Sequence, residues 1–287
     1  MNKFCLDSSI ILLDSIINML FQNKDAPVLQ LFSLKGKVSL VTGGSRGIGL
    51  AVAIGLAEAG SDIAITYNTS GNDYIAGIEK QFIGLGVKFK AYQCNVSNKE
   101  QITKCVDQVF ADFERLDVVV PNSGVTSQGP AEEFSEQDYR NTMTVNLDGA
   151  FFTAQAAANS FKKQKAEGKL DQGRIVFTAS VSSQIVNIPQ SQAPYNASKA
   201  GLVRLAKCLS VEWVDFARVN CVSPGFIVTD MLDSLPNEWR DKWMSMVPAQ
   251  RFCSPYELKG VYVYLASDAS SYMTGAELVV GGGYSLT

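Results

Sequence analysis

From Lys37 onward, short apolar runs alternate with longer amphipathic segments, and this alternation is the strongest constraint on the fold. The expected strands are Lys37–Thr42, Asp62–Tyr67, Phe89–Gln93, Leu116–Val120, Arg174–Thr178, Arg218–Val222 and Glu277–Val280. The expected helices are Ile48–Ala59, Tyr74–Leu85, Lys99–Phe113, Asp138–Phe161 and Tyr195–Val214. Such alternation indicates a parallel sheet with helices on both faces. The sequence therefore predicts an α/β fold with a doubly wound parallel sheet.

The chain of 287 residues shows no linker between these elements, so we predict one catalytic domain over residues 37–287, preceded by an N-terminal arm over residues 1–36. The apolar run at Ile10–Phe21 in the arm is too short, and too often interrupted by polar residues, to span a membrane. Its apolar positions fit one face of a helix. Two interpretations stay open: a partly disordered arm, or a helix that packs on a neighbouring subunit.

The composition excludes several classes of site and partner. A net charge of −3 with no basic block argues against binding to nucleic acid or to an anionic membrane. The absence of histidine excludes a Ser-His-Asp triad and any imidazole-based zinc site, and we predict no metal. None of the six cysteines forms a C-x-x-C pair. Cys94, Cys208 and Cys221 lie in apolar stretches, which predicts buried free thiols in a reducing compartment.

A glycine-rich turn with the spacing G-x-x-x-G-x-G follows the first expected strand, at Thr42–Gly49. Glycines at such a turn let backbone amides approach a pyrophosphate at the start of the next helix. The position between a strand and a helix favours a Rossmann-type dinucleotide site over an ordinary loop that starts a helix. The expected contacts are Gly43, Ser45, Arg46, Gly47, Ile48 and Gly49.

The end of the second expected strand indicates which dinucleotide is bound. An NAD site usually carries an acidic residue there, to bind the 2′-hydroxyl of the ribose. Residues Thr66–Ser70 contain no carboxylate, and Arg46 in the glycine turn can pair with a 2′-phosphate. Asn68, Thr69 and Ser70 can donate hydrogen bonds to the same group. We therefore predict NADP(H), with a solvated Arg46 as the alternative.

Tyr195 and Lys199 stand four residues apart in an expected helix, so their side chains share one face. The nearby ammonium is expected to favour the phenolate and to lower the pKa of Tyr195, which suits proton transfer near neutral pH. Ser180 lies just after an expected strand and completes the predicted site. Ser182 and Ser183 compete with Ser180 for this role.

Together these motifs resemble the short-chain dehydrogenase/reductase family, from about Leu34 to the C-terminus. The matching positions are Thr42–Gly49, Asn95-Val96, Asn122-Ser123-Gly124, Asn146, Ser180, Tyr195 with Lys199, and Ser223-Pro224-Gly225 with Thr229. Within the family, Ile185–Gln190 and Gln192–Asn196 are similar to the fungal group of NADPH-dependent sorbose reductases, mannitol 2-dehydrogenases and carbonyl reductases. The resemblance implies a Rossmann-type fold, a homotetramer and reduction of a ketose or another ketone.

The resemblance also implies roles for single residues. Tyr195 acts as the general acid, Lys199 hydrogen-bonds the nicotinamide ribose, and Ser180 positions the substrate carbonyl. Asn146 holds a water near Lys199. Asn122 and Thr229 contact the sugar and the carboxamide of the cofactor, and the remaining implied cofactor contacts are Asn95, Val96, Gly124, Gly225 and Ile227.

Three positions depart from the family pattern. Ser123 stands where the family usually has alanine, Gly281 stands where it has an aspartate, and Trp243-Met244 replaces a pair of tryptophans. Residues Phe226–Val247 are either a lid over the substrate or a helix pair packed on the core. Groups that could bind sugar hydroxyls are Ser127, Gln128, Asn187 and Gln190.

The sequence thus predicts an NADPH-dependent reductase that transfers hydride to a ketone or a sorbose- or fructose-type ketose, with reversible alcohol oxidation. The alternatives are a 3-oxoacyl-[acyl-carrier-protein] reductase and a catalytically silent NADP(H)-binding sensor or scaffold. Glycosylation sequons at Asn68, Asn95 and Asn196 fall within the predicted site, where a glycan would block it. This argues against secretion and predicts a cytoplasmic protein.

Overall fold

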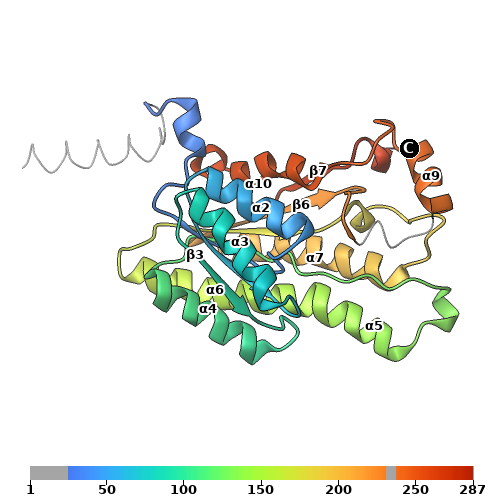
Figure 1. Ribbon diagram of the computed structural model, residues 1–287, viewed down its shortest axis with the longest axis horizontal. Coiled ribbons are helices and arrows are strands. Elements are labelled where there is room, and N and C mark those ends of the chain that lie inside the picture. The colour runs from blue at the N-terminus through green and yellow to red at the C-terminus, as the bar shows by residue number, and fades with distance from the viewer. Residues whose placement is uncertain (1–24, 231–236, 287) are drawn as a thin grey trace, which may run out of the picture.

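The structure is a computed structural model, and it describes residues 25–230 and 237–286. The strands are β1 (Val38–Val41), β2 (Asp62–Tyr67), β3 (Phe89–Gln93), β4 (Val118–Val120), β5 (Gly173–Thr178), β6 (Ala217–Pro224) and β7 (Glu277–Val280). They form one parallel sheet in the order β3-β2-β1-β4-β5-β6-β7 (Figure 1). This confirms the predicted α/β fold with a Rossmann-type, doubly wound parallel sheet.

Helices cover both faces of the sheet (Figure 1). One face carries α2 (Gly47–Glu58), α3 (Asn72–Gly84) and α10 (Lys259–Ala266), and the other carries α4 (Lys99–Phe113), α6 (Gly149–Ala166) and α7 (Ala193–Glu212). Two further helices are α5 (Glu136–Met143) and α9 (Asn237–Met246). Short 3-10 turns lie at Val28–Phe32, Ala131–Glu133, Val181–Ser183, Pro255–Leu258, Asp268–Ser270 and Tyr284–Leu286.

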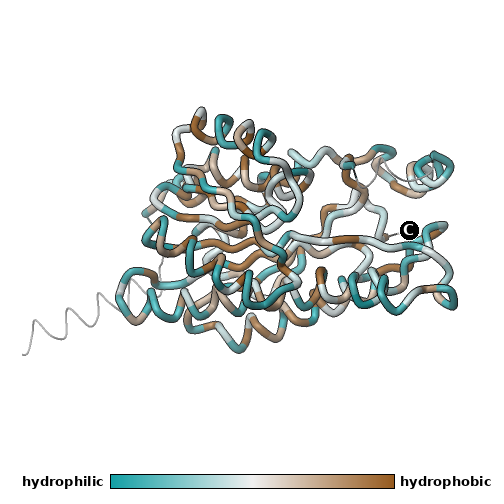
Figure 2. The backbone as a smooth tube through the Cα atoms, turned by 60° about the horizontal axis from the view of Figure 1, so that its bottom comes forward, coloured by the Kyte–Doolittle hydropathy of each residue, from teal (hydrophilic) through white to brown (hydrophobic). Residues whose placement is uncertain are grey.

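The sheet separates two hydrophobic cores, because successive side chains along a strand point to opposite faces. Val118 and Val120 pack with α2, α3 and α10, whereas Val119 packs with α4, α6 and α7. All three valines are fully buried, as expected for a central strand covered on both sides. Figure 2 shows the hydrophobic residues concentrated along the strands and on the helices that pack against them.

The long helix expected over Asp138–Phe161 is interrupted. α5 ends at Met143, residues Thr144–Asp148 form a π-helical turn, and α6 begins at Gly149. A π turn changes the direction in which the side chains of a helix point, and such turns are frequent at functional sites. This one contains the buried Asn146.

Two further features differ from the sequence-based expectation. Cys208 is exposed rather than buried, because it shares the outer side of α7 with Lys207, whereas Cys94 and Cys221 are buried free thiols as predicted. The helix α10 is absent from the prediction, since its run of valine, tyrosine and leucine has the composition of a strand. A capping box of Ser254 and Glu257 on the preceding 3-10 turn starts the helical path instead.

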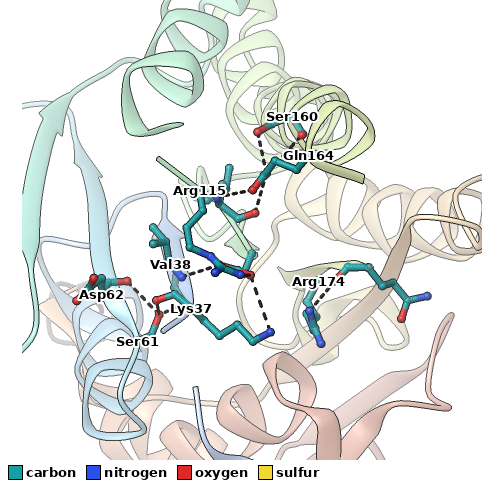
Figure 3. Close-up of polar contacts among 12 residues, drawn as sticks. Lys37, Val38, Ser61, Asp62, Arg115, Ser160, Gln164 and Arg174 are labelled. Atoms are coloured by element: carbon teal, nitrogen blue, oxygen red, sulfur yellow. Dashed lines mark hydrogen bonds and ion pairs between the residues drawn. The ribbon is translucent and has the colours of Figure 1, made fainter. Parts of the chain in front are cut away.

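The amino edge of the sheet is fixed by buried polar contacts (Figure 3). The carboxylate of Asp117, at the start of β4, accepts from the backbone N–H of Val38 at 2.8 Å. It also accepts from Arg115, through Nε at 2.8 Å and Nη2 at 2.6 Å. Gln164 of α6 hydrogen-bonds both backbone groups of Leu116. These contacts hold β1 beside β4, so the opposite, carboxyl ends of the two strands are also in register.

The predicted arm is described only from residue 25, where Val28–Phe32 forms a 3-10 helix. The apolar helix face considered for Ile10–Phe21 lies outside the described residues. Within residues 25–230 and 237–286, no helix has the length and apolar content that crossing a lipid bilayer requires.

Candidate active site

A cavity of about 710 Å³ lies at the carboxyl edge of the sheet. Its walls include the residues that follow β1 and β4, two neighbouring strands from which the chain continues to opposite faces. Open α/β sheets bind ligands at such a switch point. All the predicted catalytic and cofactor-binding residues line this cavity except Asn146, which is fully buried. Of the four candidates for binding sugar hydroxyls, Asn187 and Gln190 line the cavity, whereas Ser127 and Gln128 do not.

The glycine turn needs glycine for two different reasons. Gly43 and Gly47 have φ angles of 62° and 55°, in the left-handed region that favours glycine. A methyl group on Gly49 would overlap the carbonyl oxygen of Gly43, so only glycine lets the helix start this close to the turn. α2 begins at Gly47, and the free amides of its first turn lie at the cavity wall, where they suit a pyrophosphate.

The part of the cavity between the glycine turn and β2 suits a 2′-phosphate. Arg46 is exposed there and makes no ion pair within residues 25–230 and 237–286. Ser45 Oγ and Ser70 Oγ lie 3.0 Å apart, and Asn68 and Thr69 are exposed beside them. These groups can donate charge-assisted hydrogen bonds to a phosphate. The end of β2 offers no carboxylate to a free 2′-hydroxyl. The residues present therefore fit NADP(H).

Asn122 connects the two central strands beneath the cavity. Its Nδ2 donates to the carbonyl of Thr42 at 3.0 Å, and its backbone N–H donates to Thr42 Oγ1 at 2.9 Å. Ser123 donates its backbone N–H to the same hydroxyl at 3.1 Å. The serine that departs from the family pattern therefore leaves this connection intact. Asn95 and Val96, which follow β3, form another part of the wall.

Ser180 is the best placed of the three candidate serines. It lies just after β5 and lines the cavity together with Tyr195, and its side chain lowers the pKa of that tyrosine. Ser183 does not line the cavity, and its hydroxyl donates to the carbonyl of Ser180 at 2.7 Å. Ser182 also lines the cavity, and it donates its backbone N–H to Ser180 Oγ at 3.1 Å. The two competing serines therefore support the loop around Ser180.

Tyr195 and Lys199 project from the same face of α7, as their spacing predicts. Lys199 Nζ lies 5.7 Å from the centre of the Tyr195 ring and donates to the carbonyl of Thr178 at 2.9 Å. Burial lowers the pKa of Lys199 to about 8.

The predicted direction of the Tyr195 pKa is wrong for this structure. Burial raises the pKa of Tyr195, and the hydrogen bond with Ser180 lowers it by less. The physical reason is that the phenol is fully buried, which outweighs the other influences on it, and the Lys199 ammonium donates to the Thr178 carbonyl. The phenol is therefore held in its protonated form.

Asn146 joins the loop after β4 to α7. Its Oδ1 accepts from the N–H of Val125 at 2.8 Å, and its Nδ2 donates to the Val125 carbonyl at 2.9 Å and to Ser198 Oγ at 3.1 Å. Oδ1 also lies close to Gly124, as does Lys199 Nζ. Asn146 therefore supports the wall beside Lys199 through side-chain bonds.

Three amide side chains close the cavity near Tyr195. Asn187, Gln190 and Gln192 line the cavity and are 7%, 5% and 6% exposed. Asn187 and Gln190 are predicted from the sequence, whereas Gln192 is not. Its position three residues before Tyr195 indicates that it lies near the site. Its Oε1 accepts from Thr126 Oγ1 at 3.3 Å. Such buried amides favour a ligand that offers hydrogen-bonding partners.

Trp243 of α9 forms an apolar part of the cavity wall. Its ring is fully buried and stacks on Phe226, with ring centres 4.7 Å apart. Its Nε1 donates to the carbonyl of Ile188 at 2.9 Å. In the described part of Phe226–Val247, this packing favours the interpretation of a helix packed on the core. Met231 and Leu232, considered for a lid, lie outside the described residues.

A family model described as "Enoyl-(Acyl carrier protein) reductase" matches residues 43–285. A sorbose reductase of Candida albicans is 46% identical over 260 residues, which cover 90% of each chain. A probable NADP-dependent mannitol dehydrogenase of Yarrowia lipolytica is 42% identical over 260 residues, again 90% of each chain. The crystal structure of the NADPH-dependent 3-quinuclidinone reductase of Rhodotorula rubra superposes with a TM-score of 0.84 at 40% identity, covering 91% of this chain and 96% of that one.

Proposed function

The chain belongs to the short-chain dehydrogenase/reductase family, and from this premise we propose that it is an oxidoreductase that reduces a ketose with NADPH, reversibly. The observation that carries the proposal is one cavity that brings together Ser180, Tyr195 and Lys199 with the glycine turn and Arg46. A proton donor and a dinucleotide site in one cavity are what carbonyl reduction requires.

The bound cofactor supplies a hydride to the carbonyl carbon of the substrate. The Tyr195 hydroxyl donates its proton to the oxygen of the same carbonyl as negative charge develops there. Ser180 Oγ, which hydrogen-bonds Tyr195, donates to this oxygen and stabilises the charge. The Lys199 ammonium, which lies 5.7 Å from the centre of the Tyr195 ring, stabilises the phenolate that remains, and Asn146 positions the adjoining wall.

The choice of NADP(H) rests on the charge around the glycine turn. Arg46, Ser45 and Ser70 offer donors to a 2′-phosphate, and the end of β2 lacks the carboxylate of an NAD site. The relative from Yarrowia lipolytica is named as NADP-dependent, and the Rhodotorula rubra reductase is named as NADPH-dependent.

The buried amides favour a polyhydroxylated substrate over an acyl chain. Asn196 Nδ2 donates to Asn187 Oδ1 at 3.0 Å, which fixes the orientation of that amide and leaves the Asn187 Nδ2 group for a ligand. Gln190 Nε2 donates to Gln128 Oε1 at 3.0 Å, which leaves Gln190 Oε1 as an acceptor. A hydroxyl can both donate and accept, so a ketose satisfies both groups. The names sorbose reductase and mannitol dehydrogenase among the relatives agree with this class.

The proposed substrate class is tested by NADPH oxidation with purified protein. The substrate panel contains sorbose, fructose and xylulose, aryl ketones, and a 3-oxoacyl thioester. We expect the highest kcat/KM with a ketose. Turnover of the thioester alone would favour the acyl-carrier-protein reductase, and NADPH binding without turnover of any carbonyl would favour a silent cofactor-binding protein.

The assembly and the compartment are also part of the proposal. We propose a homotetramer, by analogy with the family, in the cytoplasm, where the sequons at the cofactor cavity stay unmodified. Light scattering coupled to size-exclusion chromatography tests the homotetramer, and a monomer in solution would contradict it. Fractionation of cells that produce the tagged full-length chain tests the cytoplasmic location.

A further inference from the structure

Two thiols that the proposed reaction does not use lie side by side next to the cofactor cavity. Cys94 and Cys105 are free, and they are 4% and 7% exposed. Both belong to one small hydrophobic cluster with Val96 and Ile102. Their packing in this cluster places the two sulfur atoms near each other, and an interaction between the two side chains shifts their pKa values in opposite directions.

Two hydrogen bonds on either side of the pair fix its geometry. The N–H of Asn95 donates to Gln101 Oε1 at 3.0 Å, and Tyr92 OH donates to Asp112 Oδ2 at 2.8 Å. Cys105 lies one turn beyond Gln101 on the same face of α4, and the other thiol lies between Tyr92 and Asn95. The end of β3 and α4 are therefore joined by hydrogen bonds on both sides of Cys94 and Cys105.

The two thiols differ in access and in acidity. Cys94 lines the cofactor cavity, between the end of β3 and the wall residues Asn95 and Val96, whereas Cys105 does not line it. A hydrogen bond from Cys105 lowers the pKa of Cys94, and the same bond together with burial raises the pKa of Cys105. The thiol that faces the cofactor cavity is thus also the one more readily converted to the reactive thiolate.

We propose that Cys94 and Cys105 form a peroxide-sensitive dithiol, which closes to a disulfide when no dinucleotide covers Cys94. Cys94 attacks one oxygen of hydrogen peroxide, the O–O bond breaks, and hydroxide leaves and takes up the Cys94 proton as water. Cys105 then attacks the Cys94 sulfur of this sulfenic acid, the S–O bond breaks, and the second water leaves with the Cys105 proton. The two thiols lose two electrons, and one peroxide is reduced to two waters.

The disulfide alters the cofactor cavity, because it ties the end of β3 to α4 directly next to Asn95 and Val96. We expect the KM for NADPH to rise several-fold on oxidation and to return on treatment with dithiothreitol. The protection by bound cofactor rests on the proposed function, since it requires NADP(H) in this cavity. Formation of the disulfide does not depend on the proposed function.

The test treats the purified full-length protein with hydrogen peroxide, with and without saturating NADP⁺, followed by alkylation and peptide mass spectrometry. We expect a linked Cys94–Cys105 peptide in the cofactor-free sample and strong suppression of it by NADP⁺. Cys208→Ser, which removes an exposed thiol far from the pair in sequence, should behave as the wild type. Cys105→Ala should stop at a Cys94 sulfenic acid, which dimedone traps.

Two results would overturn the proposal. One is cofactor-free protein in which both thiols remain alkylatable after peroxide, and the other is equal formation of the linked peptide with and without bound NADP⁺. Binding of NADP⁺ is measured separately by calorimetry. If the protein binds no NADP⁺, the proposed function is wrong. The proposed disulfide is still tested in that case, because the linked peptide is measured in the sample without cofactor. The comparison of linked peptide in wild-type protein with and without NADP⁺ tests the proposal even if Cys105→Ala fails to fold.

Discussion

At the residue scale, the environment of Tyr195 suits a proton donor. Burial raises the pKa of Tyr195, so the phenol keeps its proton until a substrate oxygen accepts it. Ser180 hydrogen-bonds this phenol, and Lys199 lies on the same helix face. The arrangement agrees with Tyr195 as the acid of the reductive direction. It requires the lysine to stabilise the phenolate formed in the reaction rather than the resting tyrosine.

Tyr195→Phe removes the proton donor and keeps the ring. We expect kcat for ketose reduction to fall by about 10²–10⁴-fold, the usual contribution of general acid catalysis. The dissociation constant for NADPH, measured by calorimetry, should stay near the wild-type value. The control is Tyr256→Phe, at an exposed tyrosine, which should keep full activity. Near-normal turnover of Tyr195→Phe would refute the assignment.

Arg46→Gln removes the positive charge assigned to the 2′-phosphate. Charge-assisted hydrogen bonds of this kind contribute about 1.5–3 kcal/mol, which corresponds to roughly tenfold or more in affinity. We expect the KM for NADPH to rise by that factor while the KM for NADH changes little. Arg140→Gln, at an exposed ion pair on α5, is the control. Equal changes in the KM values for NADPH and NADH would show that Arg46 does not bind the 2′-phosphate.

The pH dependence of reduction should follow Lys199. Burial lowers the pKa of Lys199 to about 8, so its ammonium is present below that pH and is lost above it. Because the ammonium stabilises the phenolate that Tyr195 becomes, kcat/KM for reduction should fall as the pH rises through about 8. Lys199→Arg, if active, should move the fall to higher pH. A profile that stays flat or rises through this range contradicts the assigned role.

The sequence predicts some of these residues and not others, for physical reasons. Tyr195 and Lys199 are found because a spacing of four residues on a helix is a local property. The direction in which the pKa of Tyr195 shifts is not predicted, since it depends on how completely the folded chain buries the phenol. Gln192 is missed for a similar reason, because its burial comes from the loops that fold over it.

At the scale of elements, the strands are predicted well because each is a short apolar run buried on both faces. The division between α5 and α6 is not predicted. The π turn between them is stabilised by bonds from Asn146 to Val125 and Ser198, which are distant in the sequence. Local periodicity contains no information about such contacts. The glycine turn is predicted because its requirement for glycine is local.

Gly49→Ala tests how closely α2 must approach the glycine turn. The added methyl group overlaps the carbonyl oxygen of Gly43, so the helix has to move away from the turn. We expect both a lower Tm and a large loss of NADPH affinity. Gly77→Ala is the matched control, because its methyl group meets open space in α3 and should be neutral or slightly stabilising. Unchanged NADPH binding by Gly49→Ala would contradict the role given to the turn.

At the scale of the whole molecule, the two edges of the sheet have different tasks. The amino edge is fixed by buried polar contacts around Asp117, and the carboxyl edge carries the cavity. The alternation of strands and helices predicts this division, since a parallel sheet places all its carboxyl ends together. It does not predict the buried contacts at the amino edge, which join residues far apart in the sequence.

Asp117→Ala should therefore affect stability more than catalysis. It leaves the N–H of Val38 without its partner and removes both bonds to Arg115. We expect the free energy of unfolding to fall by about 2 kcal/mol, with little change in the KM for NADPH. Chemical denaturation and steady-state kinetics measure the two effects. Glu136→Ala, at an exposed ion pair, should change stability much less. A raised KM for NADPH with an unchanged free energy of unfolding would contradict the role of Asp117 in stabilising the amino edge.

Hydride transfer from NADPH to a ketose carbonyl in this cavity is the reaction on which the proposed function depends. The most direct measurement incubates the protein with NADPH deuterated at the transferable position and a ketose, and analyses the product by mass spectrometry. We expect a polyol that carries deuterium on the former carbonyl carbon, formed by Tyr195→Phe at a rate about 10²–10⁴-fold below that of the wild type. Protein that binds NADPH but yields no labelled polyol from sorbose, fructose or xylulose would contradict it.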